Sequence, residues 1–327
     1  MAQDRIKAFC IDFNWDLLDR FASPGLYGHA DAAAHVSWYR ALGVNTIQSF
    51  FVSHNGYAWY DSSVAPRTPG MSGDFMCDLT QRGHEAGLRM MGYISPGANG
   101  QWAAAHPDLS HVPRWNTWHI PLTSTYLDYL ARLLEDALRK VPVDGFMVDM
   151  LWNVNPQWMP CEQQMFSELM GDVAPEPHEA DRLPVNVVDA FNRAATERAW
   201  RRIQEVARSV NPGCLIWLSV NNMMNAQLEH SRLAAEVDWL MNENPNMAEG
   251  LAVARRLAGR HAQLVQCVAG WEGAVHHDGP AILAALPADV GLYGFAAPDP
   301  VTTLPPDDGG INAQNTAALG RAFRGHP

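Results

Sequence analysis

The sequence predicts an α/β protein that folds as a closed (β/α)8 TIM barrel. Short apolar runs rich in β-branched and aromatic residues alternate with longer segments of helical period. The alternation repeats eight times, and the segments that leave the expected strands are longer than those that enter them. No G-x-G-x-x-G follows the first strand, which argues against an open dinucleotide-binding sheet.

The expected elements are bounded by residues that stop regular structure. Each strand is flanked by Gly, Pro, Asn or Asp, and the strands cover 6–14, 46–53, 89–95, 145–151, 215–220, 238–243, 263–269 and 291–297. The helices cover 31–42, 74–86, 124–140, 187–210, 227–235, 247–259, 280–286 and 312–323. Asp74 and Thr123 are expected N-caps, and the glycines of "EAGLR" and "VNPGCL" are expected to end helices.

The composition is that of a globular protein with a neutral ligand. The 327 residues are 47% hydrophobic and 18% charged, so residues 1–327 are expected to form a single catalytic barrel with long loops after the strands. A net charge of −12 argues against nucleic acid or an anionic membrane as partner. The charged N-terminus lacks the apolar stretch of a secretion signal, which predicts a cytoplasmic protein. Assembly into a homo-oligomer stays open.

Four long segments follow the first four strands, at 15–30, 54–73, 96–122 and 152–186. In a barrel the loops after the strands build the active site. The expected strand ends carry polar, acidic and aromatic residues, namely Asp12, Asn14, Trp15, His54, Asn55, Tyr93, Asp149, Trp152, Asn221, Asn222, Asn242, Glu243, Trp271, Glu272 and Asp299. Carboxylates, amides and imidazoles bind sugar hydroxyls, and indole rings pack on sugar C–H faces. With twelve Trp in the chain, the sequence predicts a carbohydrate ligand.

Asp149 and Glu243 are the expected catalytic pair, because most glycosidases need one ionised and one protonated carboxyl group. They end the fourth and sixth expected strands and should meet at one rim of the barrel. A separation of roughly 5–5.5 Å implies retention of configuration and roughly 6.5–9.5 Å implies inversion. Sequence alone leaves both outcomes open.

Each candidate also has a structural interpretation. Asp149 could cap a helix or form a salt bridge, and Glu243 could be a turn residue before Asn-Pro. His54 could be a satisfied hydrogen-bonding residue, and Asp12 could brace the barrel or a neighbouring Trp. The segment from Trp271 and Glu272 to the two histidines at 276–277 could be a solvated loop.

Metal and serine-nucleophile motifs are missing from the sequence. "GHEAG" at 83–87 is not H-E-x-x-H, the first strand has no H-x-H, and the five cysteines are scattered without a C-x-x-C pair. No G-x-S-x-G occurs. The expectation is an enzyme with no metal and no cofactor.

The segment "FFVSHNGYAWYDSSVAPRTPGMSGDFMCDLTQRGHEAGLRMMGYIS" at 50–95 resembles the hypothetical glycosyl-hydrolase barrels related to α-L-fucosidases. The resemblance continues through "VDGFMVDMLW" and a Cys-x-x-x-x-Phe helix in "PCEQQMFSELMG". It implies a glycosidase with Asp149 as nucleophile and with His54 and Asn55 on substrate hydroxyls. Ser53-His54-Asn55-Gly56 stands where the fucosidase-like loop usually has His-His-Asp/Glu-Gly, so the sugar stays open.

Three functional hypotheses follow. The first is a glycoside hydrolase in which Asp149 attacks or activates at the anomeric carbon and Glu243 protonates the leaving oxygen. The second is a catalytically silent sugar-binding barrel, which would bind sugars without hydrolysing them. The third is a barrel hydrolase or lyase for a non-sugar small molecule, for which a bound divalent metal would be evidence.

Overall fold

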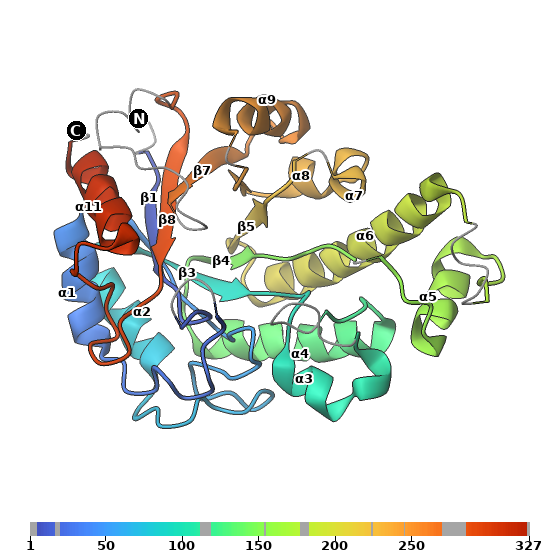
Figure 1. Ribbon diagram of the computed structural model, residues 1–327, viewed down its shortest axis with the longest axis horizontal. Coiled ribbons are helices and arrows are strands. Elements are labelled where there is room, and N and C mark those ends of the chain that lie inside the picture. Colours follow the sequence, from blue (N-terminus) through green and yellow to red (C-terminus); the bar gives the residue numbers. More distant parts are fainter. Residues whose placement is uncertain are drawn as a thin grey trace.

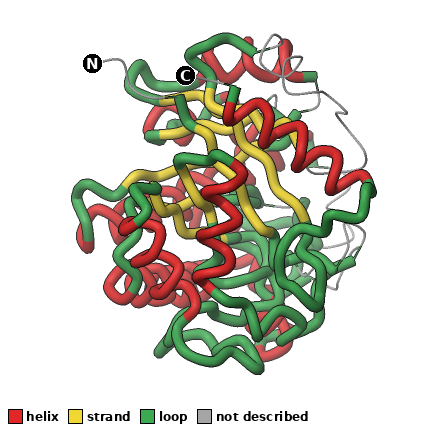
Figure 2. The backbone as a smooth tube through the Cα atoms, turned by 90° about the vertical axis from the view of Figure 1, so that its left-hand side faces the viewer, coloured by secondary structure: helices red, strands yellow, loops and turns green. Residues whose placement is uncertain are grey.

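Eight parallel strands close into a barrel in the order β1 to β8, with β8 paired back to β1. The structure is a computed structural model that describes residues 5–16, 20–111, 119–153, 155–176, 183–223, 225–244, 246–269 and 286–325. The strands lie inside and the helices surround them (Figure 2). The predicted (β/α)8 barrel is therefore confirmed.

Each strand lies within its expected range, and several of the expected ranges were longer than the strands. They are β1 (Lys7–Ile11), β2 (Thr46–Gln48), β3 (Arg89–Ile94), β4 (Gly145–Val148), β5 (Leu215–Val220), β6 (Trp239–Asn242), β7 (Gln263–Ala269) and β8 (Gly291–Ala296). Beyond β2 the chain still follows β3, because the N–H groups of Ser49 and Phe51 donate to the carbonyls of Met91 and Tyr93. The short apolar runs thus mark strand positions correctly, and the strand ends are set by pairing with neighbours.

The helices of the described residues include segments that periodicity did not predict. They are α1 (Ala32–Leu42), α2 (Phe75–Glu85), α3 (Gly100–Ala105), the 3-10 helix η1 (Pro107–Leu109), α4 (Ser124–Lys140), α5 (Pro160–Met170), α6 (Val185–Val210), α7 (Ala226–Glu229), α8 (Leu233–Glu236), α9 (Met247–Leu257) and α11 (Ile311–Arg324). The short helices α3 and η1 lie in the long loop after β3, and α5 occupies the Cys-x-x-x-x-Phe segment. The expected helix at 280–286 lies outside the described residues, apart from residue 286.

The single helix predicted at 227–235 is wrong, because the segment forms α7 and α8 with a turn between them. Both the N–H and the hydroxyl of Ser231 donate to the carbonyl of Leu228. A serine side chain that bonds to nearby backbone competes with helix continuation. The local hydrogen bond therefore ends α7 after one turn.

The predicted N-caps are confirmed. The Asp74 side chain accepts from the Cys77 N–H at the start of α2, and Thr123 accepts from the Tyr126 N–H at the start of α4. After α2, Gly87 has φ +74°, the left-handed conformation that glycine adopts without strain. Gly213 in "VNPGCL" does not have a positive φ, and α6 ends before it at Val210.

Aromatic rings pack inside the barrel and against the chain that follows β1 and β2. Trp217 contacts Trp239 and Tyr293 with ring centroids 5.2 Å apart in each case. Outside the barrel, Phe13 stacks on Trp59 at 4.2 Å and also contacts Phe75. These contacts fix the chain after β1 and β2 against the barrel.

A buried pair joins the long loops that follow β3 and β4. His111 Nε2 lies 2.7 Å from Glu162 Oε1, and the two side chains are 3% and 0% exposed. Glu162 Oε2 also accepts from the N–H groups of Gln157 and Met159, at 3.0 Å each. Helix α5 packs on α6, which extends away from the barrel (Figure 1). The pair ties this extension to the loop of α3.

Within the described part of the chain, no helix has the length and apolar character needed to cross a membrane.

Replacing Glu162 with Ala should strongly destabilise the fold. The change leaves His111 and two partly buried backbone N–H groups without their acceptor, so we expect a loss of about 3–5 kcal/mol in the free energy of unfolding, measured by urea denaturation. Glu135→Ala removes an exposed helical pair with Arg139 and should cost at most about 1 kcal/mol. Equal effects of the two variants would show that the buried pair is not an anchor.

Candidate active site

Three carboxyl groups from different strands come together at the C-terminal end of the barrel. Asp12 follows β1, Asp149 follows β4 and Glu243 follows β6. The charge of Asp149 raises the pKa of both Asp12 and Glu243, and the charge of Asp12 raises the pKa of Glu243. Such mutual effects require the groups to be near one another in a poorly solvated space. The mouth of the barrel thus collects acids that are far apart in sequence.

Asp149 is held by hydrogen bonds on both carboxyl oxygens. The Tyr93 hydroxyl donates to Oδ2 at 2.6 Å, and the Met150 N–H donates to Oδ1 at 2.8 Å. Burial raises the pKa of Asp149, and these two hydrogen bonds act in the opposite direction. Asp149 caps no helix and forms no ion pair with a described residue. Within the described residues, neither a helix cap nor a salt bridge accounts for Asp149.

Glu243 is a carboxyl group whose surroundings favour its protonated form. Burial, followed by the charges of Asp149 and Asp12, raises its pKa to about 8. Its backbone N–H donates to the Val220 carbonyl at 2.9 Å, which continues the β5–β6 pairing past the strand end. The backbone of Glu243 is therefore fixed at the end of the ladder, and the raised pKa of its side chain favours the protonated form at neutral pH.

Asp12 is the third acid of the site. Burial raises its pKa to about 7, while hydrogen bonds from the Asn14 N–H and the Trp15 side chain lower it. The Asn14 N–H lies 2.9 Å from Oδ1. Asp12 thus braces the neighbouring Trp and also faces the other two acids.

His54 is linked to Asp149 through Tyr93. His54 Nε2 lies 2.8 Å from the Tyr93 hydroxyl oxygen, and burial lowers the pKa of His54 to about 3, so the ring is neutral. Burial and the charge of Asp149 raise the pKa of Tyr93 well above 10, which keeps it a donor. Because the Tyr93 proton points to Asp149, His54 Nε2–H donates to Tyr93, and His54 Nδ1 is left buried without a partner in the described structure.

Some expected ligand-binding residues position the loops. Asn14 Oδ1 accepts from the His54 N–H at 2.8 Å, and Asn55 Oδ1 accepts from the Tyr57 N–H at 3.1 Å. Trp15 stacks on Phe21 at 4.4 Å. Trp152 and Asn221 line a pocket beside Ser219. Trp271 and Glu272 lie outside the described residues.

Two other residues at the strand ends form hydrogen bonds that stabilise the fold. Asn242 Nδ2 donates to Gln266 Oε1 at 2.7 Å, and a Cβ at Gly250 of α9 would collide with the Asn242 amide, so Asn242 lies on the helix side of the sheet. Asp299 Oδ1 accepts from the N–H groups of Val301 and Thr302 in an exposed turn.

Ser219 was not predicted as a site residue. Its hydroxyl lowers the pKa of both Asp149 and Glu243, although it makes no hydrogen bond of good geometry with a described residue. Since side chains alternate along a strand, Trp217 inside the barrel places Ser219 on the same inner face. A small polar residue at the last inward position of β5 was a signal that could have identified it.

In the part of the chain described by the structure, no group of three or more His, Cys, Asp and Glu residues is arranged to hold a metal ion. The acids instead interact with one another and with hydrogen-bond donors. Fold and site together define a barrel with carboxyl groups collected at the C-terminal ends of its strands.

Part of the chain matches a known protein family in sequence. Residues 31–150 match the family model of hypothetical glycosyl hydrolase 6, a segment that runs from the start of α1 to Asp149. The resemblance predicted from sequence is thereby confirmed for this part of the chain. No curated protein sequence matches.

Solved structures share the fold over almost the whole chain. α-L-Fucosidase isoenzyme 2 from Paenibacillus thiaminolyticus has a TM-score of 0.72 at 17% identity, over 98% of this chain and 49% of that one, so the chain spans about half the length of that enzyme. The glycoside hydrolase domain of PgaB (BpsB) from Bordetella bronchiseptica has a TM-score of 0.64 at 10% identity, over 96% and 98% of the two chains. α-L-Fucosidase AlfC from Lactobacillus casei has a TM-score of 0.53 at 13% identity, over 97% and 95%.

Glu243→Gln should change the pH dependence of stability. The folded pKa of about 8 lies above the ordinary 4.5, so the folded protein retains a proton that the unfolded chain releases, and stability falls as pH rises between these values. The glutamine variant loses this dependence. We expect it to be more stable than wild type at pH 9, by roughly 2 kcal/mol, with a smaller difference at pH 5, measured by urea denaturation at both pH values. Glu205→Gln, at an exposed position of α6, should show no such gain in stability at high pH.

Tyr93→Phe should raise the pKa of Asp149, because it removes the hydrogen bond that favours the carboxylate. Carboxyl carbon NMR titration would follow the change, with Asp149→Asn used to assign the signal. Tyr60→Phe breaks a similar bond to Asp136 away from the mouth and should leave the Asp149 titration unchanged. An unshifted Asp149 signal in Tyr93→Phe would contradict the role given to the tyrosine.

Proposed function

We propose that the protein is a glycoside hydrolase in which Asp149 and Glu243 carry the chemistry. The observation that supports this proposal most is the unequal environment of two neighbouring carboxyl groups. Burial raises the pKa of both acids, but Asp149 accepts two hydrogen bonds that favour its ionised form, whereas burial and the charges of Asp149 and Asp12 raise the pKa of Glu243 to about 8, which favours its protonated form. Glycoside cleavage in most families uses one acid in each of these two states.

Each acid then has a defined role. The Asp149 carboxylate attacks the anomeric carbon, or removes a proton from a water that attacks it, while the glycosidic C–O bond breaks. The proton of Glu243 passes to the leaving oxygen, so that the leaving group departs as a neutral alcohol. Tyr93 and His54 orient the Asp149 carboxylate. Asp12 adds negative charge near the centre that becomes positive in the oxocarbenium-like transition state.

A neutral sugar is the proposed substrate. The match to a hypothetical glycosyl hydrolase family and the fold likeness to two α-L-fucosidases and to a glycoside hydrolase domain support the reaction class. An α-L-fucoside is the first substrate to test, because the segment at 50–95 resembles barrels related to α-L-fucosidases. The loop Ser53-His54-Asn55-Gly56 differs from the usual fucosidase-like loop, so α- and β-galactosides belong in the same panel.

Asp149→Asn should reduce hydrolysis of the best nitrophenyl glycoside at least about a thousandfold, because the amide can neither attack nor accept a proton. Release of nitrophenol is the measurement. Asp144→Asn is the matched control, since Asp144 precedes the same strand at the opposite end of the barrel, where it accepts from the Met90 N–H.

The control should retain wild-type rates. Wild-type rates in Asp149→Asn would refute the assignment of the nucleophile. Sugar binding without hydrolysis by the wild-type protein across the panel would instead support the silent sugar-binding barrel.

A further inference from the structure

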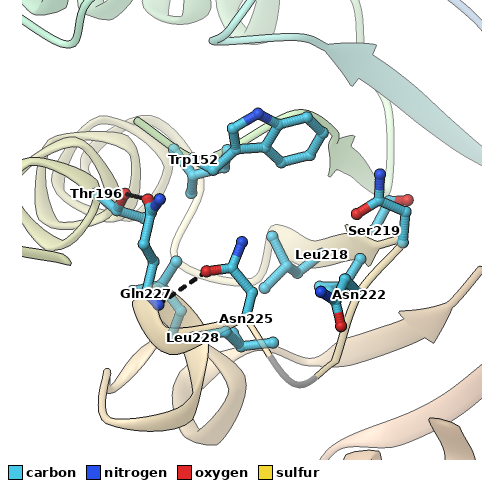
Figure 3. Close-up of a pocket in the computed structure, with 12 residues that line it drawn as sticks. Trp152, Thr196, Leu218, Ser219, Asn222, Asn225, Gln227 and Leu228 are labelled. Atoms are coloured by element: carbon cyan, nitrogen blue, oxygen red, sulfur yellow. Dashed lines mark hydrogen bonds between the residues drawn. The ribbon is translucent and has the colours of Figure 1, made fainter. Parts of the chain in front are cut away.

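A narrow pocket lies beside the carboxyl groups, between the chain after β4, the chain after β5 and helix α6 (Figure 3). Ser219, which interacts with both Asp149 and Glu243, forms one of its walls, and Trp152 lines the side across from Asn225 (Figure 3). Its volume is about 20 Å³, slightly more than one water needs. The pocket therefore admits a small substituent of a bound sugar and not a whole ring.

Most of the pocket lining is apolar. Its lining includes four leucines, Leu151, Leu218, Leu228 and Leu233. A hydroxyl group placed among them would lose its hydrogen bonds to water without replacement, whereas a methyl group would gain from leaving water. A hydroxymethyl group is therefore a poor occupant.

The rim of the pocket carries a free amide donor. Asn225 Oδ1 accepts from the Gln227 N–H at 2.9 Å, which fixes the orientation of the side-chain amide. With the oxygen held there, Nδ2 points into the pocket (Figure 3), and the described structure gives it no acceptor. A substituent that carries only a methyl group makes no use of this donor, whereas one with an acceptor oxygen beside the methyl group matches both the leucines and the amide.

Hydrogen bonds hold both sides of the pocket in place. Gln227 Oε1 accepts from the Asn153 N–H at 2.9 Å and from the Thr196 hydroxyl at 2.8 Å, and Gln227 Nε2 donates to the Asn153 carbonyl at 2.8 Å. Asn153 directly follows Trp152, and Gln227 is two residues beyond Asn225. The indole and the amide are thus positioned before a ligand binds, which reduces the entropy lost on binding.

We infer that this pocket is a subsite for an acetamido substituent on the sugar that binds at the three carboxyl groups. The methyl end packs on the leucines, and the carbonyl oxygen accepts a hydrogen bond from Asn225 Nδ2. The inference rests on the proposed glycosidase function for the position of the sugar. It adds a substrate class, the N-acetylated amino sugars and their glycosides.

Saturation-transfer NMR on the 327-residue chain tests the subsite with matched sugar pairs: N-acetylglucosamine with glucose, and N-acetylgalactosamine with galactose. In the wild-type protein the acetamido sugar of at least one pair should bind at least tenfold more tightly than its parent, with the strongest saturation at the acetyl methyl protons. Asn225→Asp keeps the oxygen that caps α7 and removes the donor. It should reduce the advantage to threefold or less.

Two further variants separate the donor from charge and folding effects. Asn225→Ser also keeps a capping oxygen, adds no charge, and should lose the advantage as well. Asn211→Asp is the matched control, because Asn211 Oδ1 accepts from the N–H two residues later, as Asn225 does, but lies exposed just after α6 at the other end of the barrel. It should behave as wild type.

Equal binding within both pairs, no binding of any of these sugars, or an advantage that survives both Asn225 variants would overturn the subsite. Glycoside hydrolysis with no preference for acetamido sugars would leave the proposed function in place and remove the subsite. Acetamido binding that depends on Asn225, together with no hydrolysis of any glycoside, would leave the subsite in place and remove the proposed catalytic function.

Discussion

The rest of the site depends on one constraint, which is that Asp12, Asp149 and Glu243 share a poorly solvated space at the barrel mouth. Burial disfavours the charged form of each acid, and each charge disfavours the others, so the three groups cannot all be ionised at low energetic cost. The hydrogen bonds around Asp149 decide where negative charge is best tolerated. For Glu243, burial and the charges of Asp149 and Asp12 outweigh the effect of the Ser219 hydroxyl and raise its pKa to about 8. The environment, and not the residue type, thus sets how readily each acid releases its proton.

Holding such groups together requires a rigid frame, which the closed sheet and its loop anchors provide. Parallel strands end at the same rim, so the barrel brings the ends of β1, β4 and β6 together. The long loops are fixed by buried polar contacts, His111 with Glu162 and Asn153 with Gln227. Both contacts lie outside the carboxyl cluster. They determine which side chains of the loops after β3, β4 and β5 can face the mouth.

Sequence periodicity was sufficient to predict the barrel and the places of its strands. It placed Asp12, Asp149 and Glu243 correctly at the ends of β1, β4 and β6, because strand ends can be read from apolar runs and turn residues. It failed at 227–235, where one serine side chain ended a helix, and it did not reveal that the amide oxygens of Asn14 and Asn55 accept hydrogen bonds from backbone N–H groups. These outcomes depend on local hydrogen-bond partners, which residue type alone does not reveal.

The sequence by itself determined the fold class, the positions of the three acids along the chain and the aromatic character of the loops. The tertiary structure decided the direction in which the pKa of each acid is shifted, the link from His54 through Tyr93 to Asp149, and the pocket between Trp152 and Asn225. Strand and helix patterns repeat over a few residues and are visible in one segment at a time. A pKa and a pocket wall depend on atoms from segments tens of residues apart, whose distances exist only once the barrel has closed.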